Sequence, residues 1–416
     1  MTIAAPQLDR VAGDLAELSN LVEPDTPGWT RRVFSDAYRA ERDWIAARMT
    51  AAGLDVHVDG AGNVVGVRPG RDPGLPPIVT GSHTDTVIGG GRYDGIVGVL
   101  GAIEAARLLR ERDVELDHDL VVVDFLGEEA NRFGTSCVGS GAFAGLLATR
   151  HLDRADPQGA RLGDAMDRFG VDPSAAVGAG LPGGRIHASV ELHVEQGPDL
   201  ERQGVPIGVV TAITGIERVV ARFAGRADHA GTMPMDDRRD ALAAAAAAVL
   251  AIERVACDGP PGAVATVGRL ESGPGQTNVV PDAATLWAEC RSVDATWLGG
   301  VRGDLTRRIV DEAQRRQVDV DLDWLTDAPP VPTTAAVRDV IAAAADDAGL
   351  PWSAMPSGAG HDTGCLAELG PVGMIFVPSA GGRSHCPEEH TDLDDIGRGI
   401  AVLAGTLARL DHTLVS

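Results

Sequence analysis

Histidine and acidic side chains recur in short motifs along the chain, and together they could hold metal ions. His83 and Asp85 lie two residues apart, so the carboxylate could orient the imidazole ring, and Asp94 follows in a glycine-rich loop. Further candidates are Glu128, Glu129, His193 and His385. Imidazole and carboxylate ligands without thiolate favour Zn²⁺, with Mn²⁺, Co²⁺ or Ni²⁺ as alternatives. Taken singly, each motif fits a surface loop or a structural histidine equally well.

The adjacent pair Glu128 and Glu129 carries the most specific chemistry. Two neighbouring carboxylates repel each other and lose hydration when buried, unless cations neutralise them. One of them could bind a metal ion while the other takes a proton from metal-bound water. The pair therefore indicates metal-assisted hydrolysis, and the alternative is an exposed acidic turn.

The elements around these motifs would bring them together. Apolar runs at Pro77–Thr80, Leu120–Val123 and Val372–Val377 predict strands buried on both faces, and Gly95–Arg110 has helical periodicity. Strands that alternate with helices predict a parallel or mixed sheet, in which ligands bind outside the carboxyl ends of the strands. We therefore expect five ligands to form a binuclear site there: His83, Asp94, Glu129, His193 and His385.

The middle of the chain has a different pattern. Strands are predicted at Glu217–Gly225, Ala263–Leu270, Thr285–Arg291 and Val318–Leu325, and helices at Asp240–Val255 and Gly300–Arg316. This β-α-β-β-α-β order is typical of a ferredoxin-like α+β domain. The proline-rich run Asp327–Pro332 reads as a linker, and Val337–Ala348 is again a helix. We expect an α/β protein with a three-layer α/β/α catalytic domain around a mixed sheet, at residues 1–212 and 329–416, and a smaller inserted α+β domain at residues 213–328.

Composition excludes several classes of protein. The 416 residues suit two domains, and a formal charge of -24 without a basic stripe disfavours nucleic-acid and membrane partners. The sequence contains no lysine, so neither a pyridoxal phosphate Schiff base nor a P-loop is possible. The five cysteines lack C-x-x-C spacing, and no long apolar run begins the chain. These features predict a cytoplasmic protein.

The motifs in combination resemble one family over roughly residues 10 to 410. They read G-S-H-T-D-T-V, G-G-R-Y-D-G, G-E-E-A-N-R-F, E-L-H-V-E-Q-G-P, D-H-A-G-T-M-P-M and G-R-S-H-C-P-E-E-H-T. The family is the amidohydrolase branch of the metallopeptidase-like hydrolases, which includes N-carbamoyl-L-amino-acid hydrolase, β-ureidopropionase and allantoate amidohydrolase. The resemblance implies that Asp94 bridges two metal ions, with His83 and His193 on one and Glu129 and His385 on the other. It also implies that Glu128 is the general base.

The resemblance implies substrate contacts as well. Arg291 would bind the substrate carboxylate, with Asn278 as its companion, while Gln196 would touch the ureido group. His229 would polarise the scissile carbonyl, often from the partner subunit in this family, and Gly360 would offer its backbone. The inserted domain would act as a lid and form a homodimer. The sequence departs from the family pattern at Thr84, at Thr363 and at Ser272–Thr277, and the last of these belongs to the loop expected to face the substrate.

The activity that the resemblance implies is hydrolysis of the carbamoyl C–N bond of an N-carbamoyl-L-amino acid. The products would be the amino acid, CO₂ and ammonia. Alternatives on the same metals are allantoate amidohydrolase, another ureido-acid hydrolase, an aminoacylase or a dipeptidase. An inactive metal-dependent binding protein is the non-enzymatic alternative. A serine hydrolase is disfavoured because Ser82 and Ser140 lack the G-x-S-x-G context.

Overall fold

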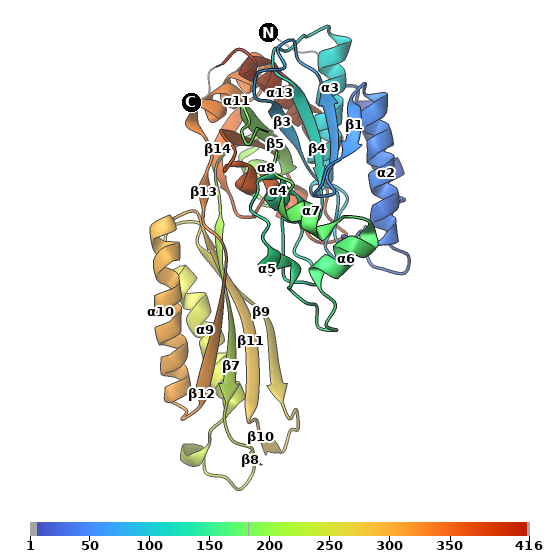
Figure 1. Ribbon diagram of the computed structural model, residues 1–416. Helices are drawn as coiled ribbons and strands as arrows, with labels where there is room; N and C mark the ends of the chain where they lie inside the picture. The colour runs from blue at the N-terminus through green and yellow to red at the C-terminus, as the bar shows by residue number, and fades with distance from the viewer. Residues whose placement is uncertain (1–5, 182, 414–416) are drawn as a thin grey trace. The chain divides into compact units, whose positions relative to one another are not determined.

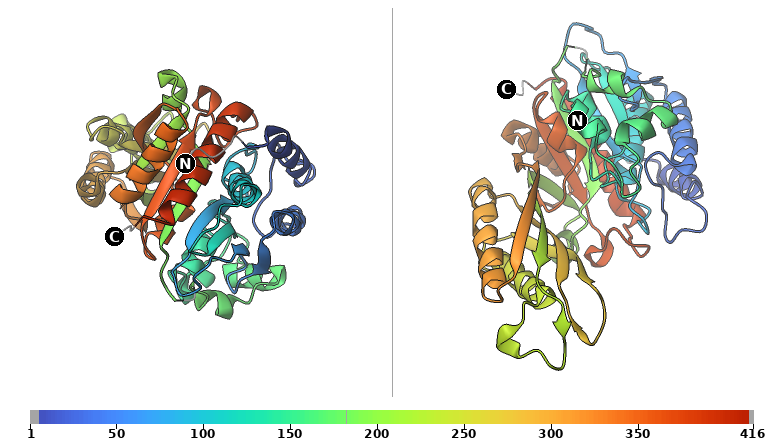
Figure 2. Two further views of the ribbon diagram at one scale, coloured as in Figure 1. Left: turned by 90° about the horizontal axis from the view of Figure 1, so that it is seen from above. Right: turned by 60° about the horizontal axis from the view of Figure 1, so that its bottom comes forward.

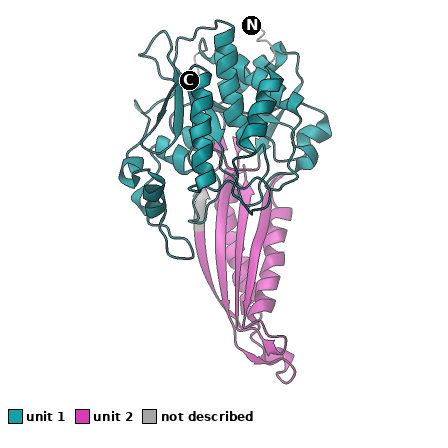
Figure 3. Cartoon of the chain, turned by 90° about the vertical axis from the view of Figure 1, so that its right-hand side faces the viewer, with its two compact units in different colours: residues 1–211, 333–357, 361–416 teal, residues 212–332, 358–360 magenta. Residues whose placement is uncertain are grey.

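The computed structural model describes residues 6–181 and 183–413 and divides into two compact units. Unit 1 comprises residues 1–211, 333–357 and 361–416, and unit 2 comprises residues 212–332 and 358–360 (Figure 3). Within the described residues, no helix is both long and apolar enough to cross a membrane.

Unit 1 is built on a mixed sheet (Figure 1). Its order is β1-β2-β4-β3-β5-β15-β6-β13, with β14 paired to β6 off this path. The strands are β1 (Asp55–Val58), β2 (Val64–Arg68), β3 (Ile78–His83), β4 (Leu120–Phe125), β5 (Ala188–Val194), β6 (Ile207–Ile213), β14 (Trp352–Ser357) and β15 (Val372–Val377). The short β13 (Val331–Pro332) pairs with Ala212 and Ile213 at the end of β6, and these four residues fall within unit 2. The four central strands β4, β3, β5 and β15 run parallel, so their carboxyl ends meet at one edge.

Helices cover both faces of this sheet (Figure 2). They are α1 (Leu8–Leu18), α2 (Asp36–Ala51), α3 (Ile96–Glu111), α4 (Val138–Phe143), α5 (Thr149–Leu152), α6 (Leu162–Phe169), α7 (Pro173–Val177), α8 (Asp199–Gln203), α11 (Ala335–Asp347), α12 (Asp362–Leu366) and α13 (Leu393–Leu410). Successive residues of β4 face the two helical layers. Val122 packs in the core formed with α3, α11 and α13, whereas Val123 packs with Phe143 of α4 and Leu366 of α12. The predicted three-layer α/β/α architecture is confirmed.

Unit 2 contains a four-stranded antiparallel sheet in the order β12-β7-β11-β9. Its elements are β7 (Gly215–Ala224), β8 (Asp228–His229), α9 (Ala241–Cys257), β9 (Val264–Gly273), β10 (Val279–Val280), β11 (Ala283–Ser292), α10 (Ala295–Gln314) and β12 (Asp319–Ala328). The long elements follow the predicted β-α-β-β-α-β order, and α9 and α10 pack on the sheet with a shared apolar core. The short strands β8 and β10 form a separate ribbon.

Two local predictions differ from the structure. The helix predicted from Gly300 begins earlier, at Ala295, because the Asp294 side chain accepts hydrogen bonds from the backbone N–H groups of Thr296 and Trp297 and caps it. The predicted linker at residues 327–332 instead contains the end of β12 and the short strand β13. β13 forms because it pairs with β6, a long-range contact that a proline-rich run does not reveal.

Candidate metal centre

The predicted ligands come from the carboxyl edge of the central parallel strands. His83 is the last residue of β3, His193 lies one residue before the end of β5, and Glu129 lies in the loop between β4 and α4. His385 lies in the loop after β15. Asp94 ends the loop between β3 and α3, where Gly95 adopts φ 68° and approaches the His83 ring so closely that a Cβ there would lie 2.5 Å from its Nε2. Only glycine permits this approach.

Asp94 lies at the centre of the cluster. Its Oδ1 is 3.2 Å from His193 Nε2 and 3.8 Å from His83 Nε2, and its Oδ2 is 3.1 Å from His385 Nε2. Glu129 Oε1 lies 3.4 Å from the same nitrogen of His385. The ligand atoms form two sets, each within 4.8 Å of one another, and Asp94 belongs to both: His83, Asp94 and His193, then Asp94, Glu129 and His385. A carboxylate shared by two sets is the arrangement that a two-metal site requires.

The buried histidine rings are oriented to present an acceptor to this centre. Nδ1 of His83 lies 3.1 Å from the carbonyl oxygen of Asp85, and Nδ1 of His193 lies 2.9 Å from that of Val194. A carbonyl oxygen only accepts, so each Nδ1 must carry a proton. In the neutral ring Nε2 then holds the lone pair and points towards Asp94, which is the tautomer that a metal ligand needs.

The buried carboxylates of the cluster are stable as anions only when positive charge lies beside them. Burial raises the pKa of Glu129 to about 8, helped by repulsion from Asp94. Burial opposes protonation of His193, yet its hydrogen bond with Asp94 raises the pKa to about 9, and the same carboxylate raises the pKa of His385 to about 9. Protons on these histidines supply the cationic charge, and divalent ions bound by the same atoms would replace them. The residues therefore fit a pair of divalent cations.

Glu128 belongs to neither ligand set, although it lies beside them. Its Oε2 is 3.6 Å from His83 Nε2, and its Oε1 lies 3.5 Å from the thiol of Cys137. Burial raises the pKa of Glu128 well above its usual range, and the charges of Asp362 and Glu129 raise it further. A buried carboxylate next to a metal site and outside its ligand sets is suited to holding and moving a proton.

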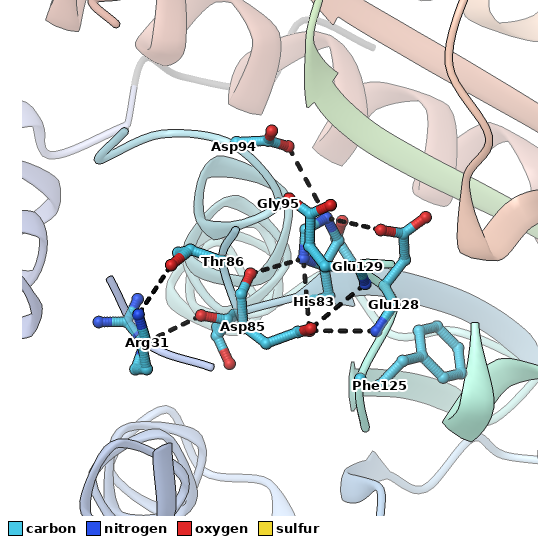
Figure 4. Close-up of polar contacts among 12 residues, drawn as sticks. Arg31, His83, Asp85, Thr86, Asp94, Gly95, Phe125, Glu128 and Glu129 are labelled. Carbon is cyan, nitrogen blue, oxygen red and sulfur yellow. Dashed lines mark hydrogen bonds and ion pairs between the residues drawn. The ribbon is translucent and has the colours of Figure 1, made fainter. Parts of the chain in front are cut away.

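Asp85 holds the loop that carries both glutamates (Figure 4). Its Oδ1 accepts the backbone N–H of Glu128 at 3.1 Å, and its Oδ2 accepts that of Glu129 at 3.2 Å. Sequence reasoning expected its carboxylate on the His83 ring, but Oδ1 lies 3.6 Å from Nδ1, while the Asp85 carbonyl oxygen makes the closer contact. Asp85 therefore connects β3 to the loop after β4 as well as orienting His83.

Glu191 of β5 and Gln196 of the loop after β5 lie beside the same cluster. Gln196 Nε2 donates to Asp94 Oδ2 at 2.9 Å, so the side chain predicted to touch a substrate faces the cluster. Sequence reasoning missed Glu191, whose carboxylate accepts the Ser82 hydroxyl at 2.7 Å and the Thr363 hydroxyl at 2.6 Å. The signal was present, because residues two apart in a strand share a face and Glu191 lies two before His193.

Two further residues missed by sequence reasoning are Ser384 and Glu389. Ser384 Oγ lies 2.6 Å from Glu389 Oε2 and 3.2 Å from Asp94 Oδ2. Both residues lie beside His385 within the G-R-S-H-C-P-E-E-H-T motif. The polar side chains of this motif were the signal from which their place at the site could have been predicted.

In unit 2, Arg291 lies near the end of β11 with 27% of its side chain exposed. Its Nε donates to Glu289 Oε1 at 2.8 Å, and Nη1 donates to the carbonyl of Gly358 at 3.2 Å. Gly358 begins the short segment that also contains Gly360, so unit 2 brings together two of the residues predicted to bind substrate. A half-buried guanidinium beside a backbone turn is suited to binding a small carboxylate.

His229 and Asn278 lie at the opposite end of the unit 2 sheet. His229 is exposed in β8, and the backbone of Ala230 donates to the Asn278 carbonyl at 3.0 Å. β8 follows the end of β7, where Ala224 pairs with Ala283, whereas Arg291 pairs with Ile216 at the start of β7. Eight residue steps along β11 correspond to about 27 Å. Within one chain, therefore, His229 and Arg291 do not meet on one small substrate.

Comparison with known proteins gives a consistent result. A sequence model described as Peptidase family M20/M25/M40 matches residues 79–409. The N-carbamoyl-L-amino-acid amidohydrolase of Paenarthrobacter aurescens is 38% identical over 99% of this chain and 100% of its own, and the ureidoglycolate hydrolase of Oryza sativa subsp. japonica is 36% identical over 97% and 84%. The crystal structure of AtUAH in complex with (S)-hydroxyglycine superposes with a TM-score of 0.90 at 34% identity, covering 99% of each chain.

Proposed function

Since this chain belongs to peptidase family M20/M25/M40 and is a hydrolase of C–N amide bonds, we propose that it hydrolyses the carbamoyl C–N bond of N-carbamoyl-L-amino acids. The observation that carries the proposal is the pair of ligand sets that share Asp94, with Glu128 beside them and in neither set. A relative 38% identical over nearly the whole chain supports the choice of substrate.

Five residues are proposed to hold the two divalent ions: His83 and His193 on one, Glu129 and His385 on the other, and Asp94 on both. Zn²⁺ suits this set best, with Mn²⁺, Co²⁺ or Ni²⁺ as alternatives. When bound, the ions supply Lewis acidity, which acidifies a water molecule and polarises a carbonyl oxygen.

Glu128 is proposed to be the general base. It accepts a proton from the attacking water and returns it to the departing amine of the amino acid. The other product, carbamate, decomposes to CO₂ and ammonia. Asp85 holds the backbone of Glu128 and thereby fixes the side chain that moves the proton.

Unit 2 is proposed to recognise the substrate. Arg291 binds its carboxylate through the guanidinium, Gly360 offers its backbone, and Gln196 of unit 1 binds the ureido group. His229 polarises the scissile carbonyl, with Asn278 beside it. Because His229 and Arg291 lie at opposite ends of the unit 2 sheet, we propose that His229 acts on the partner subunit's substrate in a homodimer formed through unit 2.

The test begins with the protein freed of metal by chelation and verified by elemental analysis. We expect no turnover of N-carbamoyl-L-amino acids until Zn²⁺, Mn²⁺, Co²⁺ or Ni²⁺ is added, with two ions bound per chain at full activity. The D-enantiomers serve as matched substrates and should react far more slowly. Full activity in the metal-free protein would contradict the binuclear site.

A second candidate, hydrolysis of ureidoglycolate or allantoate, is favoured by the relatives that carry those names. These ureido acids share the carboxylate and differ in the group on the α-carbon. A screen under identical metal loading should include them with N-acetyl amino acids and dipeptides. A catalytic efficiency higher on ureidoglycolate or allantoate than on every N-carbamoyl-L-amino acid would replace the proposed substrate and leave the metal site in place.

A further inference from the structure

A buried carboxylate lies behind the shared ligand Asp94. The side chain belongs to Glu389, and only 3% of this residue is exposed. Its Oε1 accepts the backbone N–H of Tyr93 at 2.8 Å and that of Asp94 at 3.0 Å. Its Oε2 lies 2.6 Å from the Ser384 hydroxyl. Two of these three hydrogen bonds join residues nearly 300 positions apart in the sequence.

The same contact continues to the carboxylate of Asp94. Ser384 Oγ, hydrogen-bonded to Glu389, is also 3.2 Å from Asp94 Oδ2, the oxygen that faces His385. Glu389 therefore contacts Asp94 from two sides, directly at its backbone N–H and through Ser384 at its side chain. Two buried carboxylates this close repel each other, and these hydrogen bonds offset part of that cost.

The loop before Asp94 is shaped to fit around Glu389. At Gly91, a Cβ would lie 2.2 Å from Glu389 Oε1 and 2.3 Å from its Cδ. No side chain can be added there without moving the carboxylate. The loop therefore approaches Glu389 this closely only because residue 91 is glycine. The packing of the loop against Glu389 fixes the position of Asp94.

We propose that Glu389 is a positioning residue that holds Asp94 where both metal ions can share it. The inference rests on the proposed function, because it assigns Glu389 to the two-metal site and not to the substrate. A neighbouring glutamate provides contrast: Glu388 has 60% of its side chain exposed and pairs with Arg383 at 3.0 Å, outside the cluster. The two adjacent residues have the same chemistry and differ in what they touch.

The test compares Glu389→Ala, Glu389→Gln, Gly91→Ala and the matched control Glu388→Ala. For each variant and the wild type, calorimetry with Mn²⁺ measures the affinity of both sites, and steady-state kinetics separates kcat from KM. Thermal unfolding establishes that each variant is folded at the assay temperature. Glu389→Ala should lower metal affinity or kcat by about 10–100-fold, the usual loss when a residue that orients a ligand is removed. KM should change little, since Glu389 does not touch the substrate.

The other variants distinguish positioning from general stability. Gly91→Ala should reproduce the loss while Glu389 remains, because the new methyl group displaces its carboxylate. Glu389→Gln should keep most of the metal affinity and kcat that Glu389→Ala loses. Its amide oxygen can still accept both N–H groups, and its NH₂ group can face Ser384 Oγ. Glu388→Ala should match the wild type. Should Glu389→Ala fail to fold, the Gly91→Ala and Glu389→Gln variants carry the test.

Wild-type metal affinity and kcat in folded Glu389→Ala or Gly91→Ala would overturn the inference, as would a Glu389→Gln variant no better than Glu389→Ala. Failure of the proposed function gives a different pattern, in which the wild type itself binds no Mn²⁺ or hydrolyses no ureido acid. A wild type that binds two ions without turnover of these substrates still allows the affinity comparison.

Discussion

The central strands of unit 1 are buried along their entire length, whereas β7, β9 and β11 of unit 2 all contain exposed residues. β3, β4, β5 and β15 show no exposed position, while β11 alternates along nine of its ten residues. At or just beyond the carboxyl ends of the parallel strands, His83, His193 and Glu128 have little access to water. The antiparallel sheet instead carries Arg291 on a strand whose next residue turns inward.

This difference corresponds to two kinds of chemistry. In unit 1, burial and repulsion from neighbouring carboxylates raise the pKa values of Glu128 and Glu129, so negative charge there must be balanced by cations or protons. In unit 2, the Arg291 guanidinium is half-buried and pairs with Glu289, and we propose that it exchanges this partner for the carboxylate of a substrate. Reaction groups belong where water is excluded, and recognition groups where a substrate can enter.

The largest effect is expected in unit 1, from the adjacent glutamates. Glu128→Gln should keep both metal ions and lose about 10²–10⁴-fold in kcat, because an amide cannot carry the proton. Glu129→Gln should instead weaken one metal site. Metal content by elemental analysis and kcat measured on the same samples provide the check. An exchange of the two phenotypes would reverse our assignment of base and ligand.

A smaller effect is expected in unit 2, at Arg291. Arg291→Lys replaces a planar fork by a point charge and should lower kcat/KM at least about thirtyfold, from a loss of roughly 2–5 kcal/mol. Arg222→Lys is the matched control, since Arg222 lies on the same sheet with 50% of its side chain exposed. The loss should shrink for a substrate amidated at its carboxylate, which the wild type should handle poorly. If the wild type had equal kcat/KM for the free-acid and the amidated substrate, the proposal that the substrate is an N-carbamoyl amino acid would be contradicted.

The smallest effect concerns stability, at a buried group of unit 1 outside the metal site. Burial, with repulsion from Asp124, raises the pKa of Glu41 to about 8 from an ordinary 4.5. A carboxyl with a raised folded pKa contributes stability below pH 4.5 that is lost as pH rises through 8. Glu41→Gln should therefore be more stable than wild type at pH 9 and gain less at pH 5.

Calorimetric unfolding at the two pH values measures this difference, with about 2–4 °C in Tm expected for each kcal/mol. The exposed Glu115→Gln serves as control, since its side chain is 73% exposed. A gain for Glu41→Gln that is equal at both pH values would contradict a raised pKa.

The same contrast explains what the sequence could predict. Continuous apolar runs identified β3, β4 and β15, and alternation identified β7 of unit 2, because side-chain periodicity follows local burial. β13 was missed, since Val331 and Pro332 form a strand only by pairing with β6. At the metal centre the motifs named the side chains that converge on Asp94. The contacts that hold them, such as Glu389 on Tyr93, depend on loop approaches nearly 300 residues apart and have no local signal.

The chain enters and leaves unit 2 through neighbouring residues, since Ala212 pairs with Pro332 and Ile213 with Val331. An insertion whose two ends are hydrogen-bonded to each other can be exchanged as a cassette with only two splice points. Chimaeras in which residues 212–332 come from a ureidoglycolate hydrolase would then replace the segment that carries Arg291, while His83, Asp94 and Glu128 stay in their native scaffold. Under the proposed function, gene recombination at these two positions would change the substrate-binding residues of unit 2 and leave the proposed metal ligands of unit 1 in place.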